Sequence, residues 1–174
     1  MQGLIARFDV AEYRLCRRLN RGADLRPLRR LFVGASRLGD GMAWYALLLA
    51  LPWMYGLSAL RPALAMAVSA LAGLLLYKWL KRTFVRERPF IRHRGISLAT
   101  APLDRYSFPS GHTLHAVSFT WQAVAFAPEL ALALVPLAAL IAASRVVLGL
   151  HYPTDVLVGA ALGAGFGALG AAIA

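Results

Sequence analysis

Five long apolar runs constrain the fold of this chain more than any other feature. They cover residues 42–60, 62–80, 112–128, 130–149 and 154–173. Each run is close to the ~20 residues that cross the hydrocarbon core of a bilayer as a helix. Backbone groups in lipid must pair within their own segment, so such runs fold as helices. We therefore predict an all-α protein, a polytopic membrane bundle of about five transmembrane helices, with residues 1–174 forming a single domain.

The composition favours a membrane protein whose partners carry phosphate. Hydrophobic residues make up 59% of the chain, more than a soluble domain needs, while the formal net charge is +11. An apolar body with a basic rim suits contact with anionic lipid and phosphate groups. We expect the partners to be membrane lipids and a lipid phosphate or diphosphate substrate, with no nucleic acid. The sequence carries no signal for an oligomeric state.

The first forty residues differ from the apolar runs. Residues 4–19 repeat apolar positions at helical spacing between arginines, which predicts an amphipathic helix at the membrane surface. Residues 24–38 predict a second helix of this kind. Gly39, Asp40 and Gly41 then indicate a break. We therefore divide the domain into interfacial helices over 1–40 and a transmembrane catalytic bundle over 41–174.

Polar residues are concentrated where the spans meet one membrane face. Consecutive spans alternate in direction, so the ends of the second and fourth runs lie beside the starts of the third and fifth. The residues at these four places that could bind a ligand or take part in a reaction are Lys81, Arg88, Ser110, Gly111, His112, Arg145, His151 and Asp155. Polar and ionisable groups at membrane depth are costly and usually functional, so we predict a site at this face.

The cations of this set indicate an anion site. Lys81, Arg88 and Arg145 supply the point charge and planar forks that bind phosphate oxygens. Ser110 fits the N-cap of the third run, where the free backbone N–H groups of Gly111 and its neighbours favour an anion. Phosphate is the natural ligand.

The two histidines and one carboxylate suggest the reaction. Asp155 follows His151 by four residues, so its carboxylate can accept the proton of one ring nitrogen and leave the other as a nucleophile. His112, on a different helix, can protonate a leaving oxygen. The carboxylates near this face are too few for a divalent metal. We therefore predict no metal and no cofactor, with charge neutralised by lysine and arginine.

Three motifs occur in order at fixed spacing. They are Lys81-(six residues)-Arg88-Pro89, Pro109-Ser110-Gly111-His112, and Ser144-Arg145-(five residues)-His151-(three residues)-Asp155. This pattern resembles the type 2 phosphatidic acid phosphatase superfamily. The resemblance covers residues 81–155, and the span pattern extends it over roughly 40–173. It implies a metal-independent membrane lipid phosphatase that passes through a phosphohistidine.

The resemblance also implies a role for each matched residue. His151 is the nucleophile, Asp155 orients it, and His112 is the general acid for the leaving group. The phosphate is held by Lys81, Arg88, Arg145, Ser110 and the backbone of Gly111. Many members have six spans, whereas this chain has five clear ones and surface helices in place of the first.

The substrate and the class of activity leave alternatives. The small bacterial members that the chain resembles often act on polyprenyl diphosphates, so we expect undecaprenyl diphosphate. Phosphatidic acid, phosphatidylglycerophosphate and a lipid A phosphate are the other candidates. A vanadate-dependent haloperoxidase uses a similar pocket, but five spans in so short a chain disfavour it. A non-catalytic lipid-phosphate-binding protein is disfavoured because His112, Arg145 and His151 are all present.

The resemblance implies a multi-pass protein of the bacterial inner membrane, and the basic residues bear on its orientation. The first forty residues contain nine arginines, and residues 78–105 contain eight lysines or arginines. With five spans both segments lie on the catalytic face, which the positive-inside rule assigns to the cytoplasm. Similar members commonly act at the outer face, which favours the opposite orientation.

Two further features concern packing. His115 lies outside the motifs, and we expect it to form a second-layer or interhelical hydrogen bond. Gly159, Gly163 and Gly167 recur at four-residue spacing. Small residues at this spacing let a neighbouring helix approach closely, here within one chain.

Overall fold

The computed structural model describes the backbone of residues 2–174 and the side chains of residues 9–174. The long helices are α1 (Gln2–Asn20), α2 (Arg26–Arg37), α3 (Ala43–Tyr55), α4 (Leu60–Phe84), α6 (Gly111–Phe126), α7 (Ala131–Val147) and α8 (Pro153–Ile173). The short ones are α5 (Pro89–Arg92), η1 (Arg21–Asp24), η2 (Leu38–Met42), η3 (Gly56–Ala59) and η4 (Pro128–Leu130). No strand occurs among the described residues, so the predicted all-α class is confirmed.

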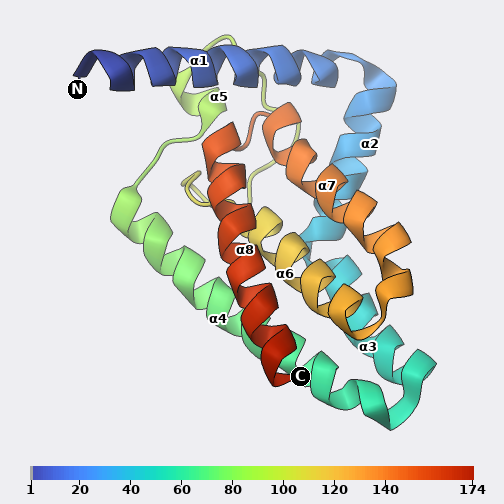
Figure 1. Ribbon diagram of the computed structural model, residues 1–174. Coiled ribbons are helices and arrows are strands. Elements are labelled where there is room, and N and C mark those ends of the chain that lie inside the picture. The colour runs from blue at the N-terminus through green and yellow to red at the C-terminus, as the bar shows by residue number, and fades with distance from the viewer. Residues whose placement is uncertain (1) are drawn as a thin grey trace.

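The helices form a bundle that α1 crosses at one end (Figure 1). The loop between α4 and α6, which contains α5, lies at the same end, and the C-terminus lies at the other (Figure 1). Cys16 of α1 packs in one buried cluster with Ile96 of this loop and Val146 of α7. The predicted amphipathic helix over residues 4–19 is present as α1, although the side chains of residues 4–8 lie outside the described part.

Three helical stretches in the described chain are long and apolar enough to cross a membrane. They are Arg26–Phe84, which contains α2 to α4, Pro128–Val147 and Pro153–Ile173. Helix α6 has only 16 residues, and it packs against α4, α7 and α8 at the centre of the bundle. The chain is a helical membrane bundle, and the number of about five spans stays a prediction.

Helix α2 continues into α3 through a kink. The predicted break at residues 39–41 lies in the π-helical turn η2, where Gly41 has φ 133°. A positive φ of this kind is open to glycine at little steric cost. Helix α2 packs along α7 and buries Ala35 and Ser36, so its small-residue side faces the bundle.

Glycines of α8 bring this helix against α6. A Cβ at Gly159 would lie 3.3 Å from the Cβ atoms of both Ser110 and Thr113. A Cβ at Gly163 would lie 3.0 Å from the Cβ of Val117. This close approach within one chain confirms the packing expected from the spacing of the glycines. It also fixes the start of α6 beside the start of α8, where the backbone N–H of Ser110 donates to the carbonyl of Asp155 at 3.0 Å.

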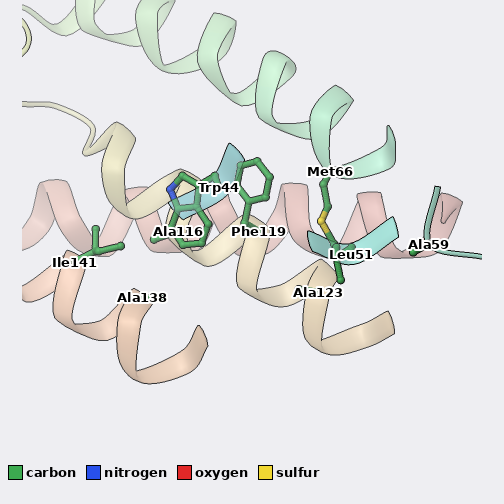
Figure 2. Packing of buried hydrophobic residues seen from close by; sticks show 9 residues of the cluster. All are labelled: Trp44, Leu51, Ala59, Met66, Ala116, Phe119, Ala123, Ala138 and Ile141. Carbon is green, nitrogen blue, oxygen red and sulfur yellow. The ribbon is translucent and has the colours of Figure 1, made fainter. Parts of the chain in front are cut away.

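An apolar core lies below the polar end of the bundle. Trp44 of α3 stacks on Phe119 of α6, with ring centroids 5.2 Å apart and planes 8° from parallel. Met66 of α4 and Ile141 of α7 belong to the same buried cluster (Figure 2). The core therefore joins α3 to α4, α6 and α7, and each of these last three helices carries predicted site residues near one end.

Candidate active site

The polar residues predicted from the four segment ends come together at the end of the bundle that α1 crosses. A cavity of about 370 Å³ is lined by Arg88, His112, Arg145 and His151. Its other walls include apolar side chains of α3 and α4, such as Trp44. The cavity therefore joins a cationic site to an apolar space.

Two of the predicted phosphate-binding cations share one carboxylate, that of Asp104. The ammonium of Lys81 lies 2.7 and 2.8 Å from the two carboxylate oxygens, and Arg88 Nη2 lies 2.7 Å from Oδ1. Burial alone would raise the pKa of Asp104, but the hydrogen bonds and charges of Lys81 and Arg88 lower it below its ordinary value. Asp104 is ionised at neutral pH and stands where both cations converge. Sequence reasoning gave this residue no role.

The third cation, Arg145, is buried at the end of α7. Its Nη1 donates to the hydroxyl of Ser36 on α2, while its Nε is buried with no hydrogen-bond partner among the described residues. An unsatisfied buried N–H is costly, so this guanidinium has donor capacity for an anion. Ser36 was not predicted as a site residue, because its sequence position gave no sign that α2 reaches Arg145.

Ser110 caps α6 as predicted. Its Oγ accepts a hydrogen bond from the backbone N–H of Thr113 at 3.4 Å. A Cβ at Gly111 would lie 3.1 Å from the ring of Tyr77 on α4, so only a residue without a side chain fits comfortably there. The start of α6 is therefore held against α4. Contact of Ser110 or Gly111 with phosphate stays a prediction.

His151 is buried in the loop between α7 and α8. Its Nε2 lies 3.3 Å from Arg88 Nη1, and the same Nη1 donates to the carbonyl of Leu150 at 2.7 Å. A guanidinium can only donate, so Nε2 carries the lone pair and the ring proton is on Nδ1. Burial, followed by the charges of Arg88, Arg145 and Lys81, holds the pKa of His151 well below its ordinary value. The imidazole is therefore neutral at neutral pH, which is its nucleophilic form.

Asp155 lies on the Nδ1 side of His151, but the two do not form a hydrogen bond in this structure. The distance from Nδ1 to Asp155 Oδ2 is 3.7 Å, and Nδ1 has no partner among the described residues. The carboxylate instead accepts from the backbone N–H of Tyr152 at 2.8 Å and from Arg86 Nη1 at 2.6 Å. Catalytic hydrogen bonds are often long before substrate binds, so the orienting role of Asp155 stays a prediction.

A second layer of charges supports Asp155. Arg86 bridges Asp155 and Glu12, with Nη2 lying 2.6 Å from the Glu12 carboxylate. The guanidinium lies 4.0 Å from the ring centroid of Tyr152, and Glu12 also accepts from the backbone N–H of Thr154 at 3.0 Å. Helix α1 therefore contributes a buried acid to the support of the site. The sequence did not single out Glu12, because a charged residue is expected on the polar face of an amphipathic surface helix.

The two histidines of α6 have different surroundings. His112 Nε2 lies 2.6 Å from Asp40 Oδ1, a contact with the kink between α2 and α3. His115 Nδ1 lies 2.9 Å from the carbonyl of Gly111, and its Nε2 lies 3.1 Å from the carbonyl of Ala70 on α4. The second contact of His115 is the interhelical hydrogen bond expected from the sequence.

No group of three or more histidine, cysteine, aspartate or glutamate side chains in the described part of the chain is placed to hold a metal ion. The charges available to a substrate phosphate are those of Lys81, Arg88 and Arg145. A reaction without a metal ion stays a prediction.

The helical membrane bundle and its predicted site residues agree with a comparison with protein families. The model of the PAP2 superfamily matches residues 62–174, and the chain belongs to this superfamily. That range contains all the predicted site residues.

The chain is also similar to individual members of known function and structure. The chain is 32% identical over 114 residues to undecaprenyl-diphosphatase BcrC of Bacillus subtilis, covering 65% of this chain and 58% of the relative. It is 42% identical over 91 residues to decaprenylphosphoryl-5-phosphoribose phosphatase of Mycobacterium tuberculosis, covering 52% and 49%. The chain thus spans about half the length of these curated relatives. The crystal structure of Aquifex aeolicus LpxE superposes with a TM-score of 0.77 at 27% identity, covering 90% of this chain and 92% of that one.

Proposed function

We propose that this protein is a lipid phosphatase of the bacterial inner membrane that hydrolyses a polyprenyl diphosphate through a phosphohistidine at His151, without a metal ion. The observation that carries the proposal is the buried neutral His151, whose Nε2 lies 3.3 Å from Arg88 in a cavity shared with His112 and Arg145. A nucleophile, an acid and cations converge there on one point.

In the first step, the lone pair of His151 Nε2 attacks the terminal phosphorus, and a P–N bond forms. The P–O bond to the leaving group breaks, and the leaving oxygen takes a proton from His112. Lys81, Arg88 and Arg145 stabilise the charge on the transferring phosphoryl oxygens. For a diphosphate the leaving group is the lipid monophosphate.

In the second step, water attacks the phosphorus of the phosphohistidine. His112, now neutral, accepts a proton from this water, and the electron pair of the P–N bond returns to His151 Nε2. Inorganic phosphate is released, and both histidines regain their starting protonation states. Asp155 stabilises the positive charge on the His151 ring while the phosphoryl group is attached.

The apolar wall of the cavity supports a lipid substrate. It includes Trp44 and Leu48 of α3 and Leu71 and Leu74 of α4, next to the catalytic side chains. The first part of a lipid chain would lie along these residues while the phosphate meets the cations. Two relatives are named for undecaprenyl and decaprenyl compounds, which supports a polyprenyl chain.

A phosphate-release panel on detergent-solubilised protein with excess EDTA tests the proposal. The substrates are undecaprenyl diphosphate, phosphatidic acid, phosphatidylglycerophosphate and a lipid A phosphate, and the control is His151→Ala. We expect release to survive the chelator, to be fastest with undecaprenyl diphosphate and to vanish in the variant. Complete loss of phosphate release in EDTA that Mg²⁺ restores would exclude the metal-free mechanism. Faster release from a phospholipid than from undecaprenyl diphosphate would exclude a polyprenyl diphosphate as the preferred substrate.

A further inference from the structure

We propose that Asp40 is the positioning residue of the general acid: it binds His112 Nε2, fixes which ring nitrogen meets the substrate and favours the protonated ring. The proposal rests on the acid role of His112 in the proposed function. It predicts that the loss of Asp40 lowers kcat most for the substrate with the most basic leaving group.

The first observation is the contact itself. His112 Nε2 and Asp40 Oδ1 are 2.6 Å apart, slightly shorter than the usual ~2.7–2.9 Å of a charge-assisted N–H to carboxylate hydrogen bond. The side chain of His112 is 10% exposed and that of Asp40 is 37% exposed, so the imidazole is the more enclosed partner. The two residues are 72 positions apart in the sequence, and the contact joins the α2–α3 kink to the start of α6.

The second observation is that the glycines of the η2 kink leave room for the imidazole of His112. A Cβ at Gly39 would lie 3.1 Å from His112 Cδ2 and 2.9 Å from a methyl group of Ile141, so a side chain there would displace the imidazole. Gly41 has φ 133°, which redirects the chain after Asp40. The carboxylate is thus presented to the ring by a turn that glycines on both sides make possible.

The third observation is the charge around the ring. Burial disfavours the charged form of the His112 ring, and the positive charges of Arg145 of α7 and Lys81 of α4 also disfavour a second proton on it. Asp40 is the carboxylate that opposes them, by its charge and by its hydrogen bond. A general acid must hold its proton in the substrate complex, and Asp40 supplies the interaction that favours this.

The contact assigns the ring nitrogens. A carboxylate can only accept, so Nε2 carries a proton, and Nδ1, which makes no hydrogen bond to the described residues, is left for the substrate. In the imidazolium form Nδ1–H donates its proton to the leaving oxygen, and the P–O bond breaks. The neutral ring then has its lone pair on Nδ1 and can take a proton from the attacking water.

The test compares two phosphate monoesters that differ in leaving group. Dodecyl phosphate releases a strongly basic alkoxide and needs the acid, whereas p-nitrophenyl phosphate releases a weakly basic phenolate and depends on it less. Full-length Asp40→Asn, Asp40→Glu and His112→Ala proteins are assayed in detergent. Asp24→Asn is a matched control, because Asp24 is an exposed residue outside the cavity.

We expect Asp40→Asn to lower kcat on dodecyl phosphate by about 10-fold, and kcat on p-nitrophenyl phosphate far less. The loss is smaller than the ~100-fold or more that acid catalysis contributes, because His112 itself remains. Asp40→Glu should recover part of the loss. The fall of kcat at rising pH, where the acid loses its proton, should begin at lower pH in Asp40→Asn. Adding Asp40→Asn to His112→Ala should cost nothing further on dodecyl phosphate, because the two residues act as a unit.

The outcomes separate this inference from the proposed function. If His112→Ala discriminates between the two esters and Asp40→Asn does not, the positioning role is overturned while the acid role stands. An equal loss on both esters in Asp40→Asn, without recovery in Asp40→Glu, would make Asp40 a structural residue and also overturn it. If His112→Ala itself fails to discriminate, the acid assignment in the proposed function is wrong.

Discussion

At the scale of single residues, Asp104 pairs with two of the cations that we propose to bind phosphate. Its carboxylate lies 2.7 Å from both Lys81 and Arg88. A phosphate that binds there has to displace it or share the cations with it. Its lowered pKa, which follows from those cations despite the opposing effect of burial, keeps Asp104 charged through the neutral range. At the proposed phosphate site we therefore expect Asp104 to weaken the binding of phosphate, the product as well as the substrate.

Asp104→Asn should therefore make inorganic phosphate a stronger inhibitor. The side chain is 40% exposed, so solvent screening limits the effect to about 1 kcal/mol, or roughly a 5-fold lower inhibition constant. Product inhibition of the purified protein measures it, with Asp24→Asn as the control. A higher inhibition constant in Asp104→Asn would mean that the carboxylate holds the cations in place for phosphate instead of competing with it.

At the scale of elements, the packing of α8 on α6 holds the catalytic segments together. Ser110 at the start of α6 and Asp155 at the start of α8 are joined by a backbone hydrogen bond of 3.0 Å. The glycine face of α8 makes this proximity possible, because a Cβ at Gly163 would meet the backbone of Leu114 and the side chain of Val117. Gly165, two residues after Gly163 and so roughly 200° around the helix, has nothing within 4 Å of its Cβ position.

The two glycines form a matched pair for mutation. Gly163→Leu should destabilise the protein by about 1–3 kcal/mol, since an overpacked interface must open. Gly165→Leu adds the same side chain to open space and should leave stability close to that of the wild type. Thermal unfolding in detergent compares them, and equal melting temperatures would contradict the close packing of α8 on α6.

Local patterns predicted the elements well, and the site in part. The apolar runs, the Ser110 cap and the α8 glycines depend on spacing along one segment, which the sequence displays directly. The contacts of Asp40 and Glu12 could not be predicted from local patterns. Asp40 lies 72 positions from His112 in the sequence, and Glu12 lies 142 positions from Thr154, so both contacts depend on how distant segments pack. For Asp155 the local pattern predicted a contact that the structure lacks. Its spacing from His151 suggested a hydrogen bond, but its oxygens accept from Arg86 and from the backbone N–H of Tyr152 instead.

At the scale of the whole molecule, α1 and the start of α8 lie at the same end of the bundle (Figure 1), and Arg86 joins Glu12 of α1 to Asp155 of α8. The end of the bundle with the predicted site residues therefore also carries the arginines of α1 and η1, whereas the other four arginines of the first forty residues lie along α2. The arginines of α1 and η1 are not among the residues of the proposed site, so we take them as markers of orientation. We propose on this basis that the catalytic face is cytoplasmic.

A cysteine at Asp24, exposed in η1, tests this orientation in a Cys16→Ala background. A membrane-impermeant thiol reagent should label it only after cells are lysed. The control is a cysteine at Leu57, which is 85% exposed in η3 near the opposite end of the bundle and should label in intact cells. Labelling of the Asp24 position in intact cells would place α1 and the active site on the outer face.

The central claim is covalent phosphate on His151, and trapping the intermediate tests it most directly. Undecaprenyl diphosphate labelled in its terminal phosphate is mixed with the protein at saturating concentration, and the reaction is stopped with alkali, in which a phosphohistidine survives. The account predicts protein-bound label that alkali preserves, that acid removes, and that maps to the peptide containing His151. Turnover without bound label, or label on any other residue, would contradict it.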